Sequence, residues 1–157
     1  MKQTWIAILG LAVIVGAMVY AFKASLFPVD KPEIFLSYNE TNLSLGDRQY
    51  RVWIADTDAK RAKGLGDIVT LDEDQAMVFV FTTPNYWPIW MKDMYFPIDI
   101  LWLDEDFVVV DLKENVSPRT YPNSFEPKVP AQYIVEFNAG ALSKGNVGLG
   151  SRLPISF

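Results

Sequence analysis

Short apolar and alternating runs occur along most of this chain, and turn-forming residues separate them. These runs predict strands at 34–38, 42–45, 49–55, 76–81, 88–92, 98–103, 107–114, 133–138 and 152–157. Gly46 and Asp47 stand between two of the runs and predict a hairpin turn in which residue 46 has a positive φ. Many short strands at this spacing predict a mainly β domain, either a sandwich or a partly closed barrel.

Helices are expected to be few and short, which argues against a parallel α/β sheet with long crossover helices. Thr57 is placed as the N-cap of a helix at 58–63, and Gly64 can end that helix in a left-handed conformation. A second helical turn is predicted at 139–144. Four prolines interrupt residues 115–130, which we therefore expect to form a long irregular loop.

The first part of the chain has a different pattern, because no charged residue occurs between Trp5 and Phe22. A helix of that length would span about 27 Å, close to the roughly 30 Å hydrocarbon core of a bilayer. We therefore expect an N-terminal transmembrane helix within residues 1–23 that anchors the protein in a membrane. A signal peptide cleaved after Ala21, which would make the protein secreted, is the alternative.

Residues 24–33 contain Pro28 and Pro32 and predict an extended linker between the membrane and the domain. Residues 34–157 then form a single β-rich domain, which is long enough to bury one core. The positive-inside rule gives a small bias toward a cytoplasmic N-terminus. The domain is accordingly expected outside the cytoplasm.

The amino-acid composition excludes several kinds of catalytic and metal site, since the 157 residues include neither cysteine nor histidine. Thiol nucleophiles, Cys/His zinc sites, Ser-His-Asp triads and histidine bases are thereby excluded. The net charge of −5 argues against a nucleic-acid partner, whose binding requires a basic surface. The sequence predicts neither a metal site nor a cofactor.

Asp99 is a carboxylate inside the apolar run 98–103, on the same face as Leu101 and Leu103. If the Asp99 carboxylate is buried, it requires a hydrogen-bond or ion-pair partner. The candidate partners are backbone N–H groups of the turn at Pro97, Lys92 or Arg61. A site carboxylate with a shifted pKa is the functional alternative.

Glu136 poses the same question in the run 133–138, where alternation places it with Ile134 and Asn138. Arg61 is its expected ion-pair partner, and a catalytic role is the alternative. Asn138 is expected in a turn, where it bonds local backbone or contacts a ligand.

Aromatic residues crowd the segment around these charges, and most of them are expected in the core. Tyr86 and Trp87 lie between two prolines in an expected exposed turn. Exposed aromatic rings there would suit stacking on a sugar ring or on a partner's surface.

Four segments, in this order and spacing, resemble the family catalogued as Domain of Unknown Function 192 (DUF192). They are Thr57 with Arg61, Lys63 and Gly64-Leu65; residues 77–81; Trp90-Met91-Lys92-Asp93-Met94 leading to Pro97-Ile98-Asp99; and residues 130–140. The resemblance covers the chain from about Leu43 to the C-terminus. It implies a compact β-sandwich of jelly-roll type in a secreted or anchored prokaryotic protein, without a known biochemical role.

The chain departs from the family pattern at four positions: Gly66, Ala76, Ile89 and Asp93. The first three concern packing, whereas Asp93 places a negative charge beside Lys92.

These observations predict a membrane-anchored extracytoplasmic module that binds a small ligand or an envelope protein and is not expected to be an enzyme. The candidate binding residues are Arg61, Trp87, Trp90, Lys92, Asp99, Glu136 and Asn138. One alternative is a hydrolase of envelope glycans that uses Asp99 and Glu136 as an acid–base pair. The other is a structural factor in envelope assembly.

Overall fold

A computed structural model describes residues 35–157. The predicted membrane helix and the whole of the predicted linker lie outside the described residues. Within the described part of the chain, we find no helix with the length and apolar character needed to cross a membrane. The chain divides into two units, residues 1–37 and 38–157, and the second contains every strand of the described residues.

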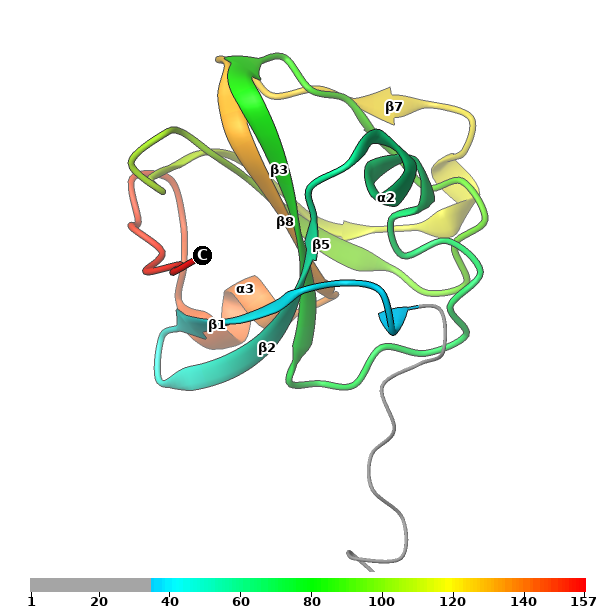
Figure 1. Ribbon diagram of the computed structural model, residues 1–157, viewed down its shortest axis with the longest axis horizontal. Coiled ribbons are helices and arrows are strands. Elements are labelled where there is room, and N and C mark those ends of the chain that lie inside the picture. Colours follow the sequence, from blue (N-terminus) through cyan, green and yellow to red (C-terminus); the bar gives the residue numbers. More distant parts are fainter. Residues whose placement is uncertain (1–34) are drawn as a thin grey trace, which may run out of the picture. The chain divides into compact units, whose positions relative to one another are not determined.

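The second unit is built on a six-stranded sheet with the order β1-β2-β3-β8-β5-β6 (Figure 1). Its strands are β1 (Glu40–Leu45), β2 (Arg48–Ala55), β3 (Gln75–Asn85), β5 (Ile98–Leu103), β6 (Val109–Val116) and β8 (Ala131–Asn138). A separate ribbon pairs β4 (Ile89–Trp90) with β7 (Ser124–Phe125). The helical elements are short: α2 (Asp58–Lys63), η2 (Pro118–Thr120) and α3 (Ala141–Gly145). The prediction of a mainly β domain with a few short helices is confirmed.

The sheet is mixed, because β2 and β3 are parallel and all its other neighbouring strands are antiparallel. This parallel pair was not predicted from the sequence. The crossover between the two strands contains α2, which has only six residues, and the loop that follows it. A crossover can therefore return the chain to a parallel neighbour with one short helix and an irregular segment.

The two faces of the sheet pack against different elements. One face carries a continuous core that includes Val135, Phe137, Leu101 and residues of the C-terminal segment. Figure 1 shows α3 and the C-terminal end on this side of β3 and β8, and α2 and β7 on the other side. Strand β8 lies between β3 and β5, so a side chain on either face of β8 lies in the middle of the sheet.

Two predicted strands are absent. Residues 35–38 form a turn, and residues 152–157 make only isolated bridges to the rest of the domain. Leu153 and Ile155 are nevertheless buried in the core. The apolar pattern at the C-terminus thus reflects side-chain packing and not strand pairing.

The region around the proline-rich loop also differs from the prediction. The strand expected at 88–92 is the two-residue β4, and its partner β7 lies inside the segment expected to be irregular. The hairpin between β1 and β2 has the predicted form, with Gly46 at a φ of +59°.

Candidate functional site

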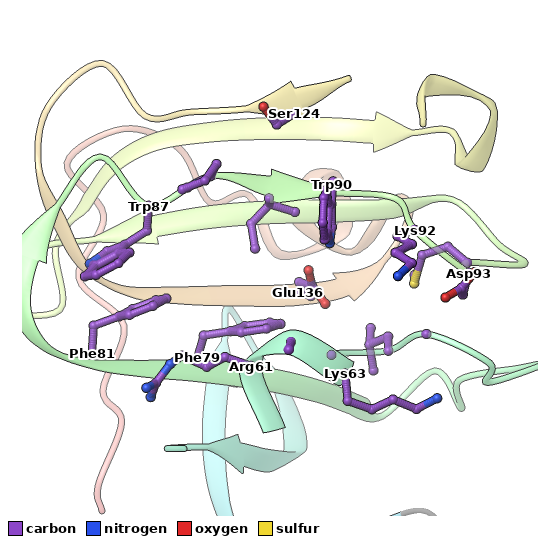
Figure 2. Close-up of a pocket in the computed structure, with 17 residues that line it drawn as sticks. Arg61, Lys63, Phe79, Phe81, Trp87, Trp90, Lys92, Asp93, Ser124 and Glu136 are labelled. Carbon is purple, nitrogen blue, oxygen red and sulfur yellow. The ribbon is translucent and has the colours of Figure 1, made fainter. Parts of the chain in front are cut away.

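A cavity of about 530 Å³ lies on the side of the sheet that carries α2 and the β4–β7 ribbon (Figure 2). Its lining comes from α2 and the turn after it, from β3, from the segment around β4, from β7 and from β8. The aromatic lining residues are Phe79, Phe81, Trp87 and Trp90, and the charged ones are Arg61, Lys63, Lys92, Asp93 and Glu136.

The end of α2 forms one wall. The side chain of Thr57 accepts a hydrogen bond from Lys60 N at 3.3 Å, which confirms the predicted N-cap. Gly64 ends the helix at a φ of +50°, and its N–H donates to Lys60 O at 2.9 Å. A Cβ atom at position 64 would lie 3.3 Å from the Phe79 ring. A glycine therefore permits both the turn and its close approach to this aromatic wall.

Arg61 does not form the predicted ion pair with Glu136. Its guanidinium donates to Val80 O at 2.7 Å and to the Asp58 carboxylate, and lies 5.0 Å from the centroid of the Phe81 ring. Figure 2 shows the side chain directed away from Glu136. The prediction was wrong because α2 offers Arg61 a carboxylate one turn away, as well as a carbonyl of the neighbouring strand.

The aromatic walls are ordered by contacts with one another and with cations. Phe81 and Trp87 stack with centroids 4.1 Å apart and an interplanar angle of 9°. Trp90, which is 52% exposed, packs edge-on against Tyr121 with centroids 6.1 Å apart. Lys92 Nζ lies 5.9 Å from the Trp90 centroid. These rings present π faces to which a cation is attracted.

Of the three cations in the lining, two have carboxylate partners. Arg61 pairs with Asp58, and Lys63 pairs with Asp67 at 2.5 Å. Lys92 has no ion-pair partner among the described residues. The Lys92–Asp99 contact considered from the sequence does not form.

Glu136 is the buried charged residue of the cavity. It is 4% exposed, and its backbone neighbours across the sheet are Met77 of β3 and Ile100 of β5, both fully buried. Its Oε2 atom has no hydrogen-bond partner within the described part of the protein. In Figure 2 the carboxyl group lies between the rings of Phe79 and Trp90. Burial among apolar groups raises the pKa of Glu136 to about 8, so the group is mainly protonated at neutral pH.

Asp99 lies on the other face of the sheet and does not line this cavity. It is fully buried and accepts hydrogen bonds from the backbone N–H groups of Asn115, at 2.8 Å, and Leu142, at 3.0 Å. The expectation that backbone donors satisfy Asp99 is correct, but the donors come from the end of β6 and from α3, not from the Pro97 turn. The carboxylate thereby ties these two segments to β5.

Asn138 has a similar structural role. It is the last residue of β8 and not part of a turn, and its amide donates to Leu71 O at 2.7 Å and to Asp72 O at 3.1 Å. It lines a second, smaller cavity of about 240 Å³. A ligand contact of Asn138 stays a prediction.

The structure therefore brings five of the seven candidate binding residues to one cavity: Arg61, Trp87, Trp90, Lys92 and Glu136. It separates Asp99 and Asn138 from them. Sequence reasoning did not assign Phe79 and Phe81 to the site, although their spacing along β3 places both on the face that Glu136 shares. Among the described residues, no group of three or more acidic side chains could hold a metal ion.

Comparison with known proteins finds two relatives that are both UPF0127 proteins. The chain is 35% identical to a UPF0127 protein of Thermococcus sibiricus over 105 residues, which are 66% of this chain and 64% of that protein. It is 38% identical to a UPF0127 protein of Thermococcus kodakarensis over 95 residues, 59% of this chain and 56% of that protein. The match thus spans less than two thirds of the length of each relative.

Two solved structures share the fold. A Sinorhizobium meliloti protein, assigned provisionally as a transcription regulator, superposes with a TM-score of 0.70 at 26% identity and covers 75% of this chain and 95% of its own. A Novosphingobium aromaticivorans protein of unknown function superposes with a TM-score of 0.67 at 22% identity and covers 74% of this chain and 84% of its own. The sequence model of the DUF192 family, described as an uncharacterized ACR, matches residues 41–155. The chain belongs to the DUF192 family.

Proposed function

We propose that this protein is a binding module that holds a small organic molecule in the cavity between the sheet and α2. The observation that carries the proposal is the Glu136 carboxyl, which is buried at the cavity and has no partner for Oε2 among the described residues. Buried polar groups in proteins are nearly always hydrogen-bonded, so an exception calls for an explanation. A ligand that supplies the missing contact is such an explanation.

The size and lining of the cavity support a ligand site. A volume of about 530 Å³ falls in the range of small-molecule pockets, and such pockets combine aromatic walls with a few polar groups. Four aromatic residues and one buried carboxyl give this cavity that composition.

Hydrolysis by an Asp99–Glu136 pair is not supported, because the sheet separates the two side chains. A glycosidase needs both carboxyl groups on the same substrate. Asp93, the other carboxylate in the lining, is exposed. Binding without catalysis therefore accounts best for the lining.

The location of the module is also part of the proposal. The uncharged stretch between Trp5 and Phe22 supports a membrane anchor, and we place the domain outside the cytoplasm. The jelly-roll connectivity implied by the family resemblance stays a prediction. The provisional assignment of the Sinorhizobium meliloti protein to transcription regulation is not extended to this chain, since a net charge of −5 disfavours contact with DNA.

A fragment screen tests the proposal. Ligand-observed NMR on the full-length protein is expected to give hits that lose binding in Ser124→Trp, which places an indole in the lining, and that weaken in Glu136→Leu. Glu105→Gln changes an exposed carboxylate outside the cavity and serves as the control. Hits that bind all the variants equally, or a screen without hits, would contradict the proposal.

A protein partner is the second candidate, favoured by the exposed ring pair of Trp90 and Tyr121. A loop of an envelope protein could insert an aromatic or apolar side chain beside these rings. This candidate predicts that Tyr121→Ala abolishes co-purification of the partner and that Tyr86→Ala, a change of an exposed ring outside the cavity, does not.

A further inference from the structure

We infer that the cavity selects an organic ammonium ion, a small molecule whose protonated amine pairs with Glu136 while its apolar part lies against the aromatic walls. The inference rests on the proposed function, because it specifies the ligand of the same cavity. Three observations support it: Glu136 lacks hydrogen-bond donors, aromatic residues line the cavity, and the other charged residues of the lining do not pair with Glu136.

The missing donors are the first argument. Arg61 is engaged by Val80 O and Asp58, and Lys63 is engaged by Asp67, so neither cation of α2 serves Glu136. Register neighbours Met77 and Ile100 have no N–H or O–H group in their side chains. An ammonium group supplies up to three donors together with the opposite charge, whereas a ligand hydroxyl or carbonyl satisfies the carboxyl only in part.

The aromatic walls are the second argument. Two of the lining rings already have cations over them, since the Arg61 guanidinium is 5.0 Å from Phe81 and Lys92 Nζ is 5.9 Å from Trp90. Electron-rich ring faces attract an ammonium or alkylammonium group, most strongly where water is excluded. A carboxylate in a cavity that is partly lined by aromatic rings is therefore suited to a cation that is itself partly apolar.

The balance of the charges that face Glu136 also favours a cationic ligand. From α2 come Arg61 and Lys63, each neutralised by its own carboxylate. The segment after β4 contributes Lys92 and the adjacent Asp93, which have opposite charges. The lining residues on β3 and β7 carry no charge. Lys92 and Asp93 are both exposed to solvent, whereas Glu136 is the buried charged group of the described lining, and it is negative when ionised.

The size of the cavity then distinguishes an organic from an inorganic cation. A volume of about 530 Å³ greatly exceeds what a bare metal ion fills, and three carboxylates that could hold a metal do not occur together in the described residues. The occupant is therefore an amine with a ring-sized or similarly bulky apolar part.

Three probes with the same phenyl ring test the inference. 2-Phenylethylammonium, 2-phenylethanol and phenylacetate differ in the head group, which is cationic, neutral or anionic. Isothermal titration calorimetry at about pH 8 with the full-length protein is expected to show the ammonium binding about tenfold more tightly than the alcohol. Glu136→Gln, which keeps the shape and removes the charge, is expected to abolish this preference while the alcohol still binds.

Each other outcome has a defined meaning. If the alcohol or phenylacetate binds as tightly as the ammonium, the inference is wrong and the proposed function stands. If the preference for the ammonium persists in Glu136→Gln and in Glu136→Leu, the cation does not pair with Glu136 and the inference is also wrong. If none of the probes binds the wild-type protein, the ammonium inference is wrong, and the fragment screen decides the proposed function separately.

Discussion

Asp99 and Glu136 lie on adjacent strands of one sheet, but their side chains are on opposite faces of it. Asp99 is directly opposite Phe137 in the β5–β8 register, so it is displaced by one residue from the position opposite Glu136. Asp99 accepts two backbone hydrogen bonds, whereas Glu136 Oε2 accepts none among the described residues. One carboxyl group therefore supports the fold, and the other can serve a ligand.

Asp99→Ala is expected to destabilise the protein strongly without a direct effect on the cavity. The change leaves the N–H groups of Asn115 and Leu142 without their acceptor in a buried environment. Two hydrogen bonds to a charged acceptor contribute roughly 3–6 kcal/mol to the free energy of unfolding. Urea denaturation measures the loss, and Asp99→Asn, which keeps one acceptor oxygen, is expected to lose less. Unchanged stability combined with lost ligand binding would reverse the roles assigned to the two carboxyl groups.

Glu136 is expected to make stability fall as the pH rises. Its pKa is raised in the folded protein from 4.5 to about 8, so between these values the folded state binds a proton more tightly than the unfolded state. The contribution of Glu136 to the free energy of unfolding is therefore largest below about pH 4.5. It decreases progressively as the pH rises from about 4.5 to about 8.

Comparing the wild type with Glu136→Gln isolates this contribution. We expect similar free energies of unfolding near pH 5 and an advantage for the variant of roughly 3–5 kcal/mol above pH 8. Urea denaturation at several pH values measures the difference, and Glu105→Gln is the matched control at an exposed glutamate. A difference that does not depend on pH would show that Glu136 titrates normally.

Trp90→Ala is expected to weaken ligand binding more than it weakens the fold. The indole lines the cavity but is 52% exposed, so its removal is expected to cost about 1 kcal/mol of stability or less. Loss of one ring contact is expected to reduce the affinity for 2-phenylethylammonium about five- to twentyfold. Calorimetry and thermal melting measure the two effects. Tyr86→Ala, at an equally exposed ring outside the lining, is expected to leave the affinity unchanged, and an equal loss in both variants would argue against the cavity.

Lys92→Gln distinguishes a simple amine from a ligand that also carries an anionic group. Lys92 is the lining cation without an ion-pair partner in the described residues, so it repels a cationic ligand. Its neutralisation is expected to raise the affinity for 2-phenylethylammonium about two- to fivefold at low ionic strength, as titration calorimetry would show. A lower affinity in the variant would mean that Lys92 contributes to holding the ligand.

The sequence predicted those parts of the fold that depend on local interactions. The β1–β2 hairpin follows from Gly46, and α2 follows from the Thr57 cap and the Gly64 terminator, because each of these signals acts within a few residues. Strand β5 was predicted at its observed bounds. The parallel pairing of β2 with β3 was not predicted, since it depends on contacts between segments distant in the chain.

The sequence identified most of the residues of the candidate site but not the contacts that they make. The lining residues Trp90, Lys92 and Glu136 were identified because they belong to distinctive segments. The expected Arg61–Glu136 pair was wrong, because a sequence does not show which acceptor a long side chain reaches first, and here Asp58 is the nearer choice. Asp99 was wrongly included in the site for a similar reason. The sequence does not show the register of β5 against β8, and this register puts Asp99 and Glu136 on opposite faces of the sheet.

The central claim is that the buried Glu136 carboxyl binds a cationic ligand. The most direct test is to measure the titration midpoint of this carboxyl with and without the ligand. In the full-length protein with ¹³C-labelled glutamate, NMR should show one carboxyl with a midpoint near pH 8, absent in Glu136→Gln. Saturating 2-phenylethylammonium should lower that midpoint by about two units, because the ligand stabilises the ionised form. A midpoint near the ordinary value of 4.5 in the free protein, or a midpoint that the ligand does not change, would contradict the account.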